Sequence, residues 1–429
     1  MNRYPEYKES GVEWIGEIPK HWQIKKLKYV AKILPSNVDK HIYPDEIQVR
    51  LCNYTDVYYN DYITVDTVLK KGSCKESEFA KFVLKKSDVI ITKDSETPDD
   101  IGVPTYVKDD LDSVVCGYHL TMLRPLACRG AYIFRFIQSD RTRRYFEVNS
   151  NGITRYGLGK ASIENLFLPI PPDSEQQQIA NFLDQKTGKI DELIRIKERQ
   201  IELLQEQRTA LINQAVTKGL DPNVEMKPSD VEWIGEIPAH WKIGKIKHVA
   251  TLVSKKSTPE TDAIKISPEN VESETGKVLD FYSSYDAVGV KFQDGDVLFN
   301  KIRVYLNKVV FAKYDGYSLG EMIVIRPTLQ RISKYLFYLM LSNRFIEYCD
   351  SISYGAKMPR TAVDDILNTK IPIPLDQEKL QIANFLDHKT EQINELIATE
   401  QRKIELLKEY RQTLISEAVT GKIDVRNEV

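Results

Sequence analysis

The sequence predicts an α+β protein with a pseudo-two-fold internal repeat, in which two mixed α/β domains are joined by two long helices that form an antiparallel coiled coil. Two segments predict this arrangement, because each occurs twice and the copies alternate. VEWIGEIP at residues 12–19 returns at 231–238, and QIANFLD at 178–184 returns at 381–387. A variable stretch follows each copy of the first segment. We therefore expect a domain, a helix, a second domain and a second helix at residues 1–173, 174–222, 223–377 and 378–429.

The composition is that of ordinary globular domains and excludes several classes of protein. Of the 429 residues 42% are hydrophobic, in short runs broken by charges, which predicts no membrane span. The N-terminal residues contain no apolar stretch typical of a secretion signal, so we expect a cytoplasmic protein. The five cysteines are widely spaced without a Cys-x-x-Cys pair, which favours neither disulfides nor a zinc site.

The charge balance is uninformative about nucleic acids. Lys and Arg number 60 against 62 Asp and Glu, for a formal net charge of −2. A nucleic-acid-binding domain usually shows a basic excess, but only the local face matters to a phosphate backbone. The charge therefore neither indicates DNA binding nor excludes it.

The first repeated segment is rich in large aromatic residues. Trp14 and Trp22 stand at fixed positions around a proline and recur as Trp233 and Trp241, while His21 recurs as His240. Tryptophans at fixed spacing beside a proline favour a packing module over direct contact with a ligand.

The second repeated segment predicts a long helix, because it has no internal proline and is rich in Glu, Gln, Lys, Arg, Ile and Leu. Its apolar residues keep a 3–4 spacing over four heptads, which is typical of a coiled-coil seam. About 40 residues at 1.5 Å each make a rod of about 60 Å. An antiparallel pairing closes the repeated chain most simply, so we expect the two termini to lie close together.

One seam position carries opposite charges in the two helices, Lys197 in the first and Glu400 in the second. If the helices pair antiparallel with full overlap, these two side chains meet near the middle and set the register. The alternative is that both side chains extend to solvent. We expect Lys197→Glu alone to weaken the helix pair and reversal of both charges to be tolerated.

The variable stretches share a skeleton but little sequence. Strand-like runs at 88–93 and 296–301, and at 114–124 and 316–326, are followed by helical runs at 131–146 and 334–349. A loop with glycine and basic residues comes next, at 154–160 and 353–361, and Pro-Ile-Pro then separates each domain from its helix. A shared skeleton with divergent loops is expected if each loop set recognises something different.

Motifs for catalysis are missing from the sequence. Gly159-Lys160 lacks the spacing and the following Ser or Thr of a phosphate-binding loop. No methyltransferase tetrapeptide is present, and the six histidines have no metal-ligand spacing. Asp88, Lys93 and Asp94 could form a nuclease-like cluster, but such clusters arise by chance when 28% of residues are charged.

The ordered set of motifs resembles the specificity subunits of type I restriction–modification systems (the HsdS family). The residues that carry the resemblance are the two WIGEIP-x-HW segments, DVLFNKIR at 296–303, GAKMPR at 355–360, Pro-Ile-Pro and QIANFLD. The resemblance implies that the variable stretches are target recognition domains, each reading one half of a bipartite, asymmetric site in double-stranded DNA. The helices would then set the spacer and dock two modification (M) subunits.

The resemblance also implies that this chain carries no catalysis and no cofactor of its own. S-adenosylmethionine, ATP and Mg would belong to partner subunits, which include restriction (R) subunits in the full complex. Readers of this kind have half-sites about one DNA turn apart, roughly 34–36 Å, which a rod of this length can span.

Candidate DNA contacts are side chains that donate to base edges or phosphates from loops. Each could equally be a solvated surface side chain. In the first domain they are Lys93, Ser95, Thr97, Tyr118, His119, Thr154, Arg155, Tyr156 and Lys160, and in the second Lys301, Arg303, Tyr305, Asn307, Lys308, Lys357 and Arg360.

The first domain departs from the second at two places. Residues 94–100 are acidic where the second domain has Ile302 to Lys308, so this loop either accepts from cytosine N4 or faces away from DNA. His119 aligns with Leu319 or Gly320, which makes a core position an alternative. Two other functions stay open from the residues alone, a self-contained nuclease or methyltransferase and a coiled-coil scaffold with protein-binding domains.

Overall fold

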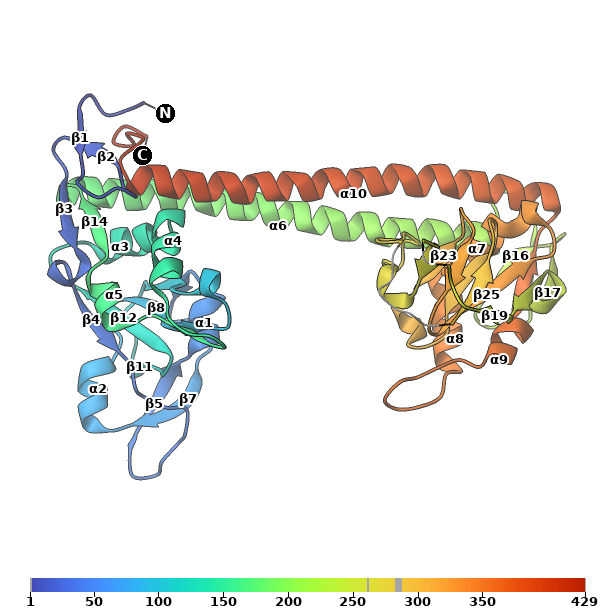
Figure 1. The fold of residues 1–429 in the computed structure, drawn as a ribbon, viewed down its shortest axis with the longest axis horizontal. Helices are drawn as coiled ribbons and strands as arrows, with labels where there is room; N and C mark the ends of the chain where they lie inside the picture. Colours follow the sequence, from blue (N-terminus) through green and yellow to red (C-terminus); the bar gives the residue numbers. More distant parts are fainter. Residues whose placement is uncertain (1, 261, 282–287, 429) are drawn as a thin grey trace. The chain divides into compact units, whose positions relative to one another are not determined.

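The computed structural model describes residues 2–260, 262–281 and 288–428. The chain divides into two compact units, Met1–Lys197 with Arg402–Val429, and Glu198–Gln401. Each unit holds one mixed α/β domain together with parts of both long helices (Figure 1). The predicted α+β class is confirmed.

The first unit is built on a five-stranded sheet with a smaller three-stranded sheet beside it. The larger sheet has the order β4 (Ala31–Pro35), β12 (Leu120–Pro125), β8 (Val89–Thr92), β10 (Pro104–Val107) and β6 (Tyr62–Ile63). The smaller has the order β11 (Val114–Cys116), β5 (Ile47–Cys52) and β7 (Lys70–Cys74). Every residue of β8 is buried, as expected for a central strand of hydrophobic sequence.

Short ribbons and helices complete this unit. The two-stranded pairs are β1 (Tyr7–Glu9) with β2 (Glu17–Pro19), β3 (Gln23–Lys26) with β14 (Phe167–Ile170), and β9 (Asp94–Ser95) with β13 (Tyr156–Gly157). The helices are α1 (Tyr54–Tyr58), α2 (Glu76–Phe82), α3 (Gly130–Ile137), α4 (Asp140–Asn149) and α5 (Lys160–Glu164).

The second unit repeats this plan with two four-stranded sheets. One has the order β18 (Ala250–Val253), β25 (Met322–Pro327), β22 (Val297–Asn300) and β23 (Val309–Phe311), and the other β19 (Lys256–Ser257), β21 (Gly289–Phe292), β24 (Gly316–Ser318) and β20 (Lys265–Ile266). The ribbons are β15 (Met226–Pro228) with β16 (Glu236–Pro238), and β17 (Lys242–Lys245) with β26 (Lys370–Ile373). Its helices are α7 (Ser333–Leu341), α8 (Asn343–Ser351) and α9 (Val363–Asn368).

The repeated QIANFLD segment lies in the long helices α6 (Asp173–Lys218) and α10 (Asp376–Val419). Seam residues that the heptads select are buried, including Leu183, Ile190 and Ile194 on α6 and Leu386, Ile393, Ile397 and Ile404 on α10. Neither helix contains proline, and both begin just after the Pro-Ile-Pro segment.

The two helices run antiparallel within each unit. In the first unit, Tyr132 Oη donates to Pro169 O at 2.8 Å and to Val419 O at 3.0 Å, so the start of α6 lies beside the end of α10. Arg411 on α10 then reaches Asp191 further along α6. In the second unit, Tyr335 Oη bonds Val216 O at 3.2 Å and Pro372 O at 3.1 Å, the equivalent pair of contacts.

The aspartate that ends each QIANFLD segment fastens a domain to its helix. Asp184 accepts two hydrogen bonds from Arg135, whose side chain is 1% exposed. Asp387 accepts from Tyr338 Oη at 2.8 Å and pairs with Lys334. The segment therefore repeats because both domains need the same anchor.

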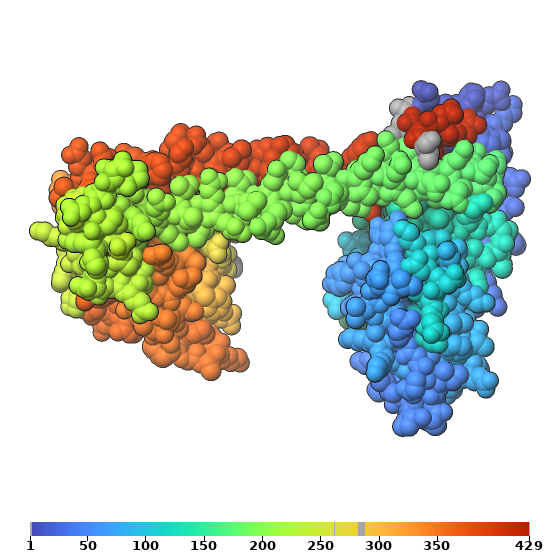
Figure 2. All heavy atoms as spheres, turned by 180° about the vertical axis from the view of Figure 1, so that it is seen from behind, coloured from blue at the N-terminus to red at the C-terminus, as the bar shows by residue number. Residues whose placement is uncertain are grey.

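The described ends of the chain lie together, as predicted. Asp424 N donates to Asn2 O at 2.8 Å, and Arg426 lies over the Tyr4 ring at 4.9 Å from its centroid. The C-terminal and N-terminal segments gather at the same place on the first unit (Figure 2). Helix α10 ends at Val419, and the residues after it form the C-terminal segment that meets the N-terminal one.

The single helical runs predicted at 131–146 and 334–349 are wrong. Each is two helices, α3 and α4 in the first domain and α7 and α8 in the second. Ser139 and Ser342 stand at the breaks in extended conformation, and the Ser139 side chain accepts from Thr142 N at the start of α4. A serine N-cap ends one helix and begins the next, which hydrophobic periodicity alone does not reveal.

Candidate nucleic-acid interface

The repeated tryptophan segment is a packing module, as predicted, and it packs each domain onto the start of a long helix. Trp22 is fully buried and its Nε1 donates to Glu175 Oε1 at 3.2 Å, while His21 Nε2 lies 2.8 Å from Glu175 Oε2. Trp241 and His240 make the same contacts with Glu378, at 3.3 and 2.9 Å. Burial alone would raise the pKa of Glu378, but hydrogen bonds from His240, Leu375 N and Trp241 leave it lowered.

In the first domain, three separate loops meet at the ends of the central strands. Strand β13 pairs with β9, which places Tyr156 opposite Ser95. Lys93 N donates to His119 O at 2.9 Å and Leu158 N donates to Lys93 O at 2.8 Å. The structure therefore brings together the three segments around 93–97, 118–119 and 154–160 that the sequence singled out.

Side chains from these loops form a charged cluster. His119 Nδ1 lies 2.5 Å from Asp94 Oδ2, and Arg155 Nη2 lies 3.4 Å from the same nitrogen. Lys93 Nζ donates to Ser36 O at 2.8 Å and lies over the ring of Tyr118, which is 49% exposed. An exposed arginine, a half-buried lysine and an exposed aromatic ring on adjoining loops suit contact with a nucleic-acid backbone and bases.

The acidic loop is partly engaged by protein groups. Asp94 faces His119, and Asp100 accepts from Tyr58 Oη at 2.8 Å. Tyr58 stacks on Tyr54, with ring centroids 5.6 Å apart. The predictions from sequence missed these two tyrosines on α1, although the tyrosine-rich run at 54–62 was a visible signal.

In the second domain, the equivalent loops meet in the same way. Lys301 N donates to Glu321 O at 3.2 Å and Thr361 N donates to Lys301 O at 3.0 Å. Ile302 forms a β-bridge with Arg360, and Arg303 N donates to Pro359 O at 2.7 Å. Loops 301–308 and 353–361 are thus one surface, carrying the exposed side chains of Arg303, Tyr305 and Lys357.

These contacts correct the alignment of the two domains. The residue equivalent to His119 is Glu321, since each lies opposite the equivalent lysine, and not Leu319 or Gly320. Glu321 pairs with Lys301 at 3.0 Å. His119 is a partly exposed member of a polar cluster, so its alternative place in the core is wrong.

Several predicted contact residues have packing roles instead. Asn307 is 3% exposed and its Nδ2 donates to Leu341 O at 2.9 Å at the end of α7. Ser95 is 7% exposed, within strand β9. Lys308 is partly buried and donates to Pro268 O at 2.7 Å. Sequence could not separate these from surface residues because hydrogen-bonding side chains serve both roles.

The remaining candidates stay on the surface. Thr97, Thr154, Arg155 and Lys160 are exposed, with Lys160 Nζ 3.3 Å from Glu164, and Tyr156 and Arg360 are half-buried. The pairing of Lys197 with Glu400 stays a prediction, because these residues belong to different units.

An Arg–Asp pair lies at the start of a central strand in each domain. Arg124 donates to both carboxylate oxygens of Asp88, at 3.0 and 2.7 Å, and Arg326 does so to Asp296, at 2.8 and 2.7 Å. Both aspartate side chains are 1% exposed. The aspartates precede strands β8 and β22, whose opposite ends lead to Lys93 and Lys301, so these pairs fix the starts of the strands from which the contact loops extend.

The described residues contain neither a metal-binding cluster nor a membrane-spanning helix. No group of three or more His, Cys, Asp or Glu among them could hold a metal ion. Within the same part of the chain, no helix is long and apolar enough to cross a membrane. The five cysteines are free and buried.

The sequence matches the family described as "Type I restriction modification DNA specificity domain" at residues 19–204 and again at 238–406. The two matches take in both domains and most of both helices. The chain belongs to this family. It is a specificity subunit, the DNA-recognition component of a restriction–modification system, and not a catalytic one.

Relatives of this specificity subunit share its length and fold. It is 24% identical to the type I restriction enzyme MjaIX specificity subunit of Methanocaldococcus jannaschii over 98% of this chain and 97% of that one. The MjaVIII specificity subunit of the same organism is 25% identical over 69% and 71%. A crystal structure of the HsdS subunit from Thermoanaerobacter tengcongensis is 16% identical, with TM-score 0.53 over 95% and 98%.

A second solved structure is more similar in fold. It comes from a study of complex assembly and conformational transition of the type I R-M system, and has TM-score 0.71 at 15% identity over 95% of this chain and 99% of that one. The likeness supports the fold alone.

Proposed function

We propose that this specificity subunit recognises a bipartite, asymmetric site in double-stranded DNA, each domain reading one half. The observation that carries the proposal is the pair of equivalent loop surfaces with different chemistry. The first presents His119, Asp94 and Arg155, and the second Glu321 with Lys301. Equivalent positions with different donors and acceptors select different bases.

The long helices would set the distance between the half-sites. Arg411 contacts Asp191 in the first unit, and Arg208 contacts Asn394 in the second, at equivalent heptad positions. The two helices therefore pair in the same register in both units. A spacer needs a fixed register, because sliding of one helix along the other would change the distance that it sets.

Two modification subunits would dock on the outer faces of the helices. Leu193 and Leu396 occupy equivalent positions and are 45% and 51% exposed, and Leu203 and Leu406 are 48% and 47% exposed. Paired exposed leucines suit one partner surface used twice. S-adenosylmethionine, ATP and Mg would belong to these partners and to restriction subunits, in the cytoplasm where the chromosome is accessible.

Genome-wide methylation mapping with and without this gene tests the bipartite site. We expect one motif of two unlike halves with a fixed gap to vanish when the gene is deleted. A contiguous motif, or an unchanged methylome, would contradict the proposal, and binding without sequence preference would favour a scaffold.

The spacer is tested by inserting one heptad in both helices, after Gln200 and after the equivalent Lys403. Seven residues add about 10 Å, which corresponds to about three base pairs. We expect the gap to lengthen and both half-sites to stay the same. A four-residue insertion in one helix only is the control, since it breaks the register and should abolish activity. An unchanged gap after the paired insertion would rule out the spacer role.

A further inference from the structure

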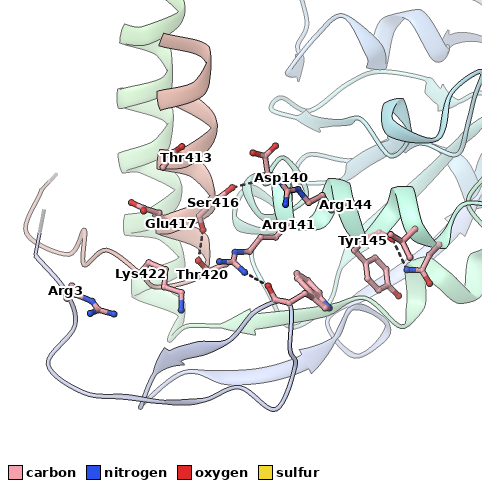
Figure 3. Close-up of a pocket in the computed structure, with 13 residues that line it drawn as sticks. Arg3, Asp140, Arg141, Arg144, Tyr145, Thr413, Ser416, Glu417, Thr420 and Lys422 are labelled. Atoms are coloured by element: carbon pink, nitrogen blue, oxygen red, sulfur yellow. Dashed lines mark hydrogen bonds between the residues drawn. The ribbon is translucent and has the colours of Figure 1, made fainter. Parts of the chain in front are cut away.

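The first unit contains a partly open cavity of about 1160 Å³ (Figure 3). Residues of helix α4, the N-terminal segment and the C-terminal end of α10 line it. Four cations line it: Arg3, Arg141, Arg144 and Lys422. Two carboxylates, Asp140 and Glu417, also face it, and Asp140 lies 3.1 Å from Arg143.

Backbone carbonyls position two of the cations. Arg141 Nη1 donates to Trp14 O, and Lys422 Nζ donates to Glu17 O at 2.7 Å. Within the described part of the chain, none of the four cations forms an ion pair with a carboxylate. A carbonyl orients a cation without cancelling its charge, so a concentrated positive charge faces the cavity.

These cations also act on one another. Burial lowers the pKa of Lys422, and the nearby charges of Arg141 and Arg3 act in the same direction, while Glu17 and Glu9 act against them. An anion in the cavity would relieve this repulsion.

The second unit supplies an internal comparison. Arg344 corresponds to Arg141 and makes a similar contact, donating at 3.3 Å to Ile234 O, the carbonyl one residue beyond the counterpart of Trp14. The other three cations are not repeated. Strands β1 and β15 pair with their partners in the same register, which places Pro222 at the position of Arg3. The equivalent glycines Gly421 and Gly219 place Leu220 at the position of Lys422. The alignment of helices α4 and α8 places Glu347 at the position of Arg144.

The comparison separates packing from binding. The second unit folds around Arg344 without the other three cations, so the fold does not require them. They were added to, or kept in, one copy only. A group of four cations that packing does not need, that forms no ion pair within the described residues, and that outnumbers the two carboxylates beside it is suited to an anionic ligand.

We propose that this cavity binds a phosphate group. Guanidinium groups match phosphate oxygens with two parallel hydrogen bonds, and Arg144 and Arg3 have donors that no carboxylate occupies. Helix α4 ends at Asn149, a few residues before the contact loop at 154–160. The phosphate is therefore supplied either by DNA flanking the first half-site, in which case the inference rests on the proposed function, or by a free polyphosphate such as a nucleotide.

The test variant copies the second unit, combining Arg144→Glu with Lys422→Leu. Both residues occur at the equivalent places of a unit that folds, so loss of structure is not expected. The control combines Arg195→Glu with Lys189→Leu, an equal change of charge at exposed positions on α6 away from the cavity. Far-ultraviolet circular dichroism checks that both variants are folded.

Calorimetric titration of the full chain with inorganic pyrophosphate is the first arm. We expect the parent and the control to bind, and the test variant to bind about tenfold more weakly or not at all. This arm does not involve a target site, so it stands or falls independently of half-site recognition.

The second arm compares DNA duplexes with long and trimmed flanks beyond the first half-site. If the test variant is weaker only on the long flank, DNA supplies the phosphate. If only pyrophosphate binding is lost, the ligand is a free phosphate compound. No pyrophosphate binding by the parent, equal loss in the control, or binding of polyglutamate in place of pyrophosphate would overturn the proposal, the last by assigning the cavity to an acidic protein segment.

Discussion

Arg411 on α10 is held by Asp191 on α6, with hydrogen bonds of 2.8 Å from Nε and 3.2 Å from Nη2. The same guanidinium reaches Asp61 of the first domain at 2.8 Å. One side chain thus joins both helices and the domain. Its counterpart Arg208 is 5% exposed and donates to Asn394 Oδ1 at 2.7 Å. In both helices, the arginine at this polar seam position therefore forms a hydrogen bond with the other helix.

Arg411→Ala should lower the free energy of unfolding by about 1–3 kcal/mol, because charged hydrogen bonds are lost and two aspartates remain. Urea unfolding measures this change. Arg402→Ala is the control on the same helix, where an exposed pair with Glu405 at 3.0 Å should contribute less than about 1 kcal/mol. Equal effects of the two variants would show that Arg411 does not join the parts.

Arg326→Ala should destabilise the second domain by about 3–5 kcal/mol, because it leaves the carboxylate of Asp296 buried without its partner. Arg326→Lys should recover only part of the loss, since one ammonium group cannot reproduce two parallel hydrogen bonds. Thermal unfolding of parent and variants checks the order. A variant Arg331→Ala, which removes an exposed arginine that pairs with Asp376, should change stability little.

The stabilising contribution of Glu378 should decrease as the pH falls. Its folded pKa lies below the usual value for glutamate, so its contribution is present above the unfolded pKa of about 4.3 and is lost as pH falls through the lowered folded pKa. The difference in unfolding free energy between parent and Glu378→Gln should therefore be greatest near pH 6–7 and shrink below about pH 4.3. Urea unfolding across this range measures it, with Glu395→Gln as the charge-matched control. A difference that grows on acidification would have the wrong sign.

Asn307 and Arg155 should separate folding from recognition. Asn307 has φ of 45° and a buried hydrogen bond to Leu341 O, so Asn307→Ala should cost about 1–3 kcal/mol of stability and leave the methylation motif unchanged. Arg155 is exposed, and Arg155→Ala should instead weaken methylation through one half-site, by about 1–3 kcal/mol if it contacts bases. Methylation mapping and urea unfolding of both variants show which residue contributes to stability and which to recognition. A changed methylation motif in the Asn307 variant would show that Asn307 takes part in DNA recognition.

The sequence by itself determined the frame of this protein. Heptads such as Leu183–Ile190 and Leu386–Ile393 specify long helices because apolar side chains recur at the helical period and no proline interrupts them. The duplicated tryptophans predicted the packing segments, and the order of the motifs identified the family. All of these signals are local in the chain or copied within it.

Only the tertiary structure decided which polar residues reach the surface. Asn307 and Arg155 both have side-chain N–H donors. Asn307 uses its donor on Leu341 O at the end of α7, whereas Arg155 lies on an exposed loop. His119 is equivalent to Glu321, and not to Leu319 or Gly320, because its carbonyl accepts from Lys93 N as the carbonyl of Glu321 accepts from Lys301 N. The cations around the cavity come from residues 3, 141, 144 and 422. Distances between such residues depend on how elements pack, and the pattern along a chain carries no record of contacts between side chains that are far apart in sequence.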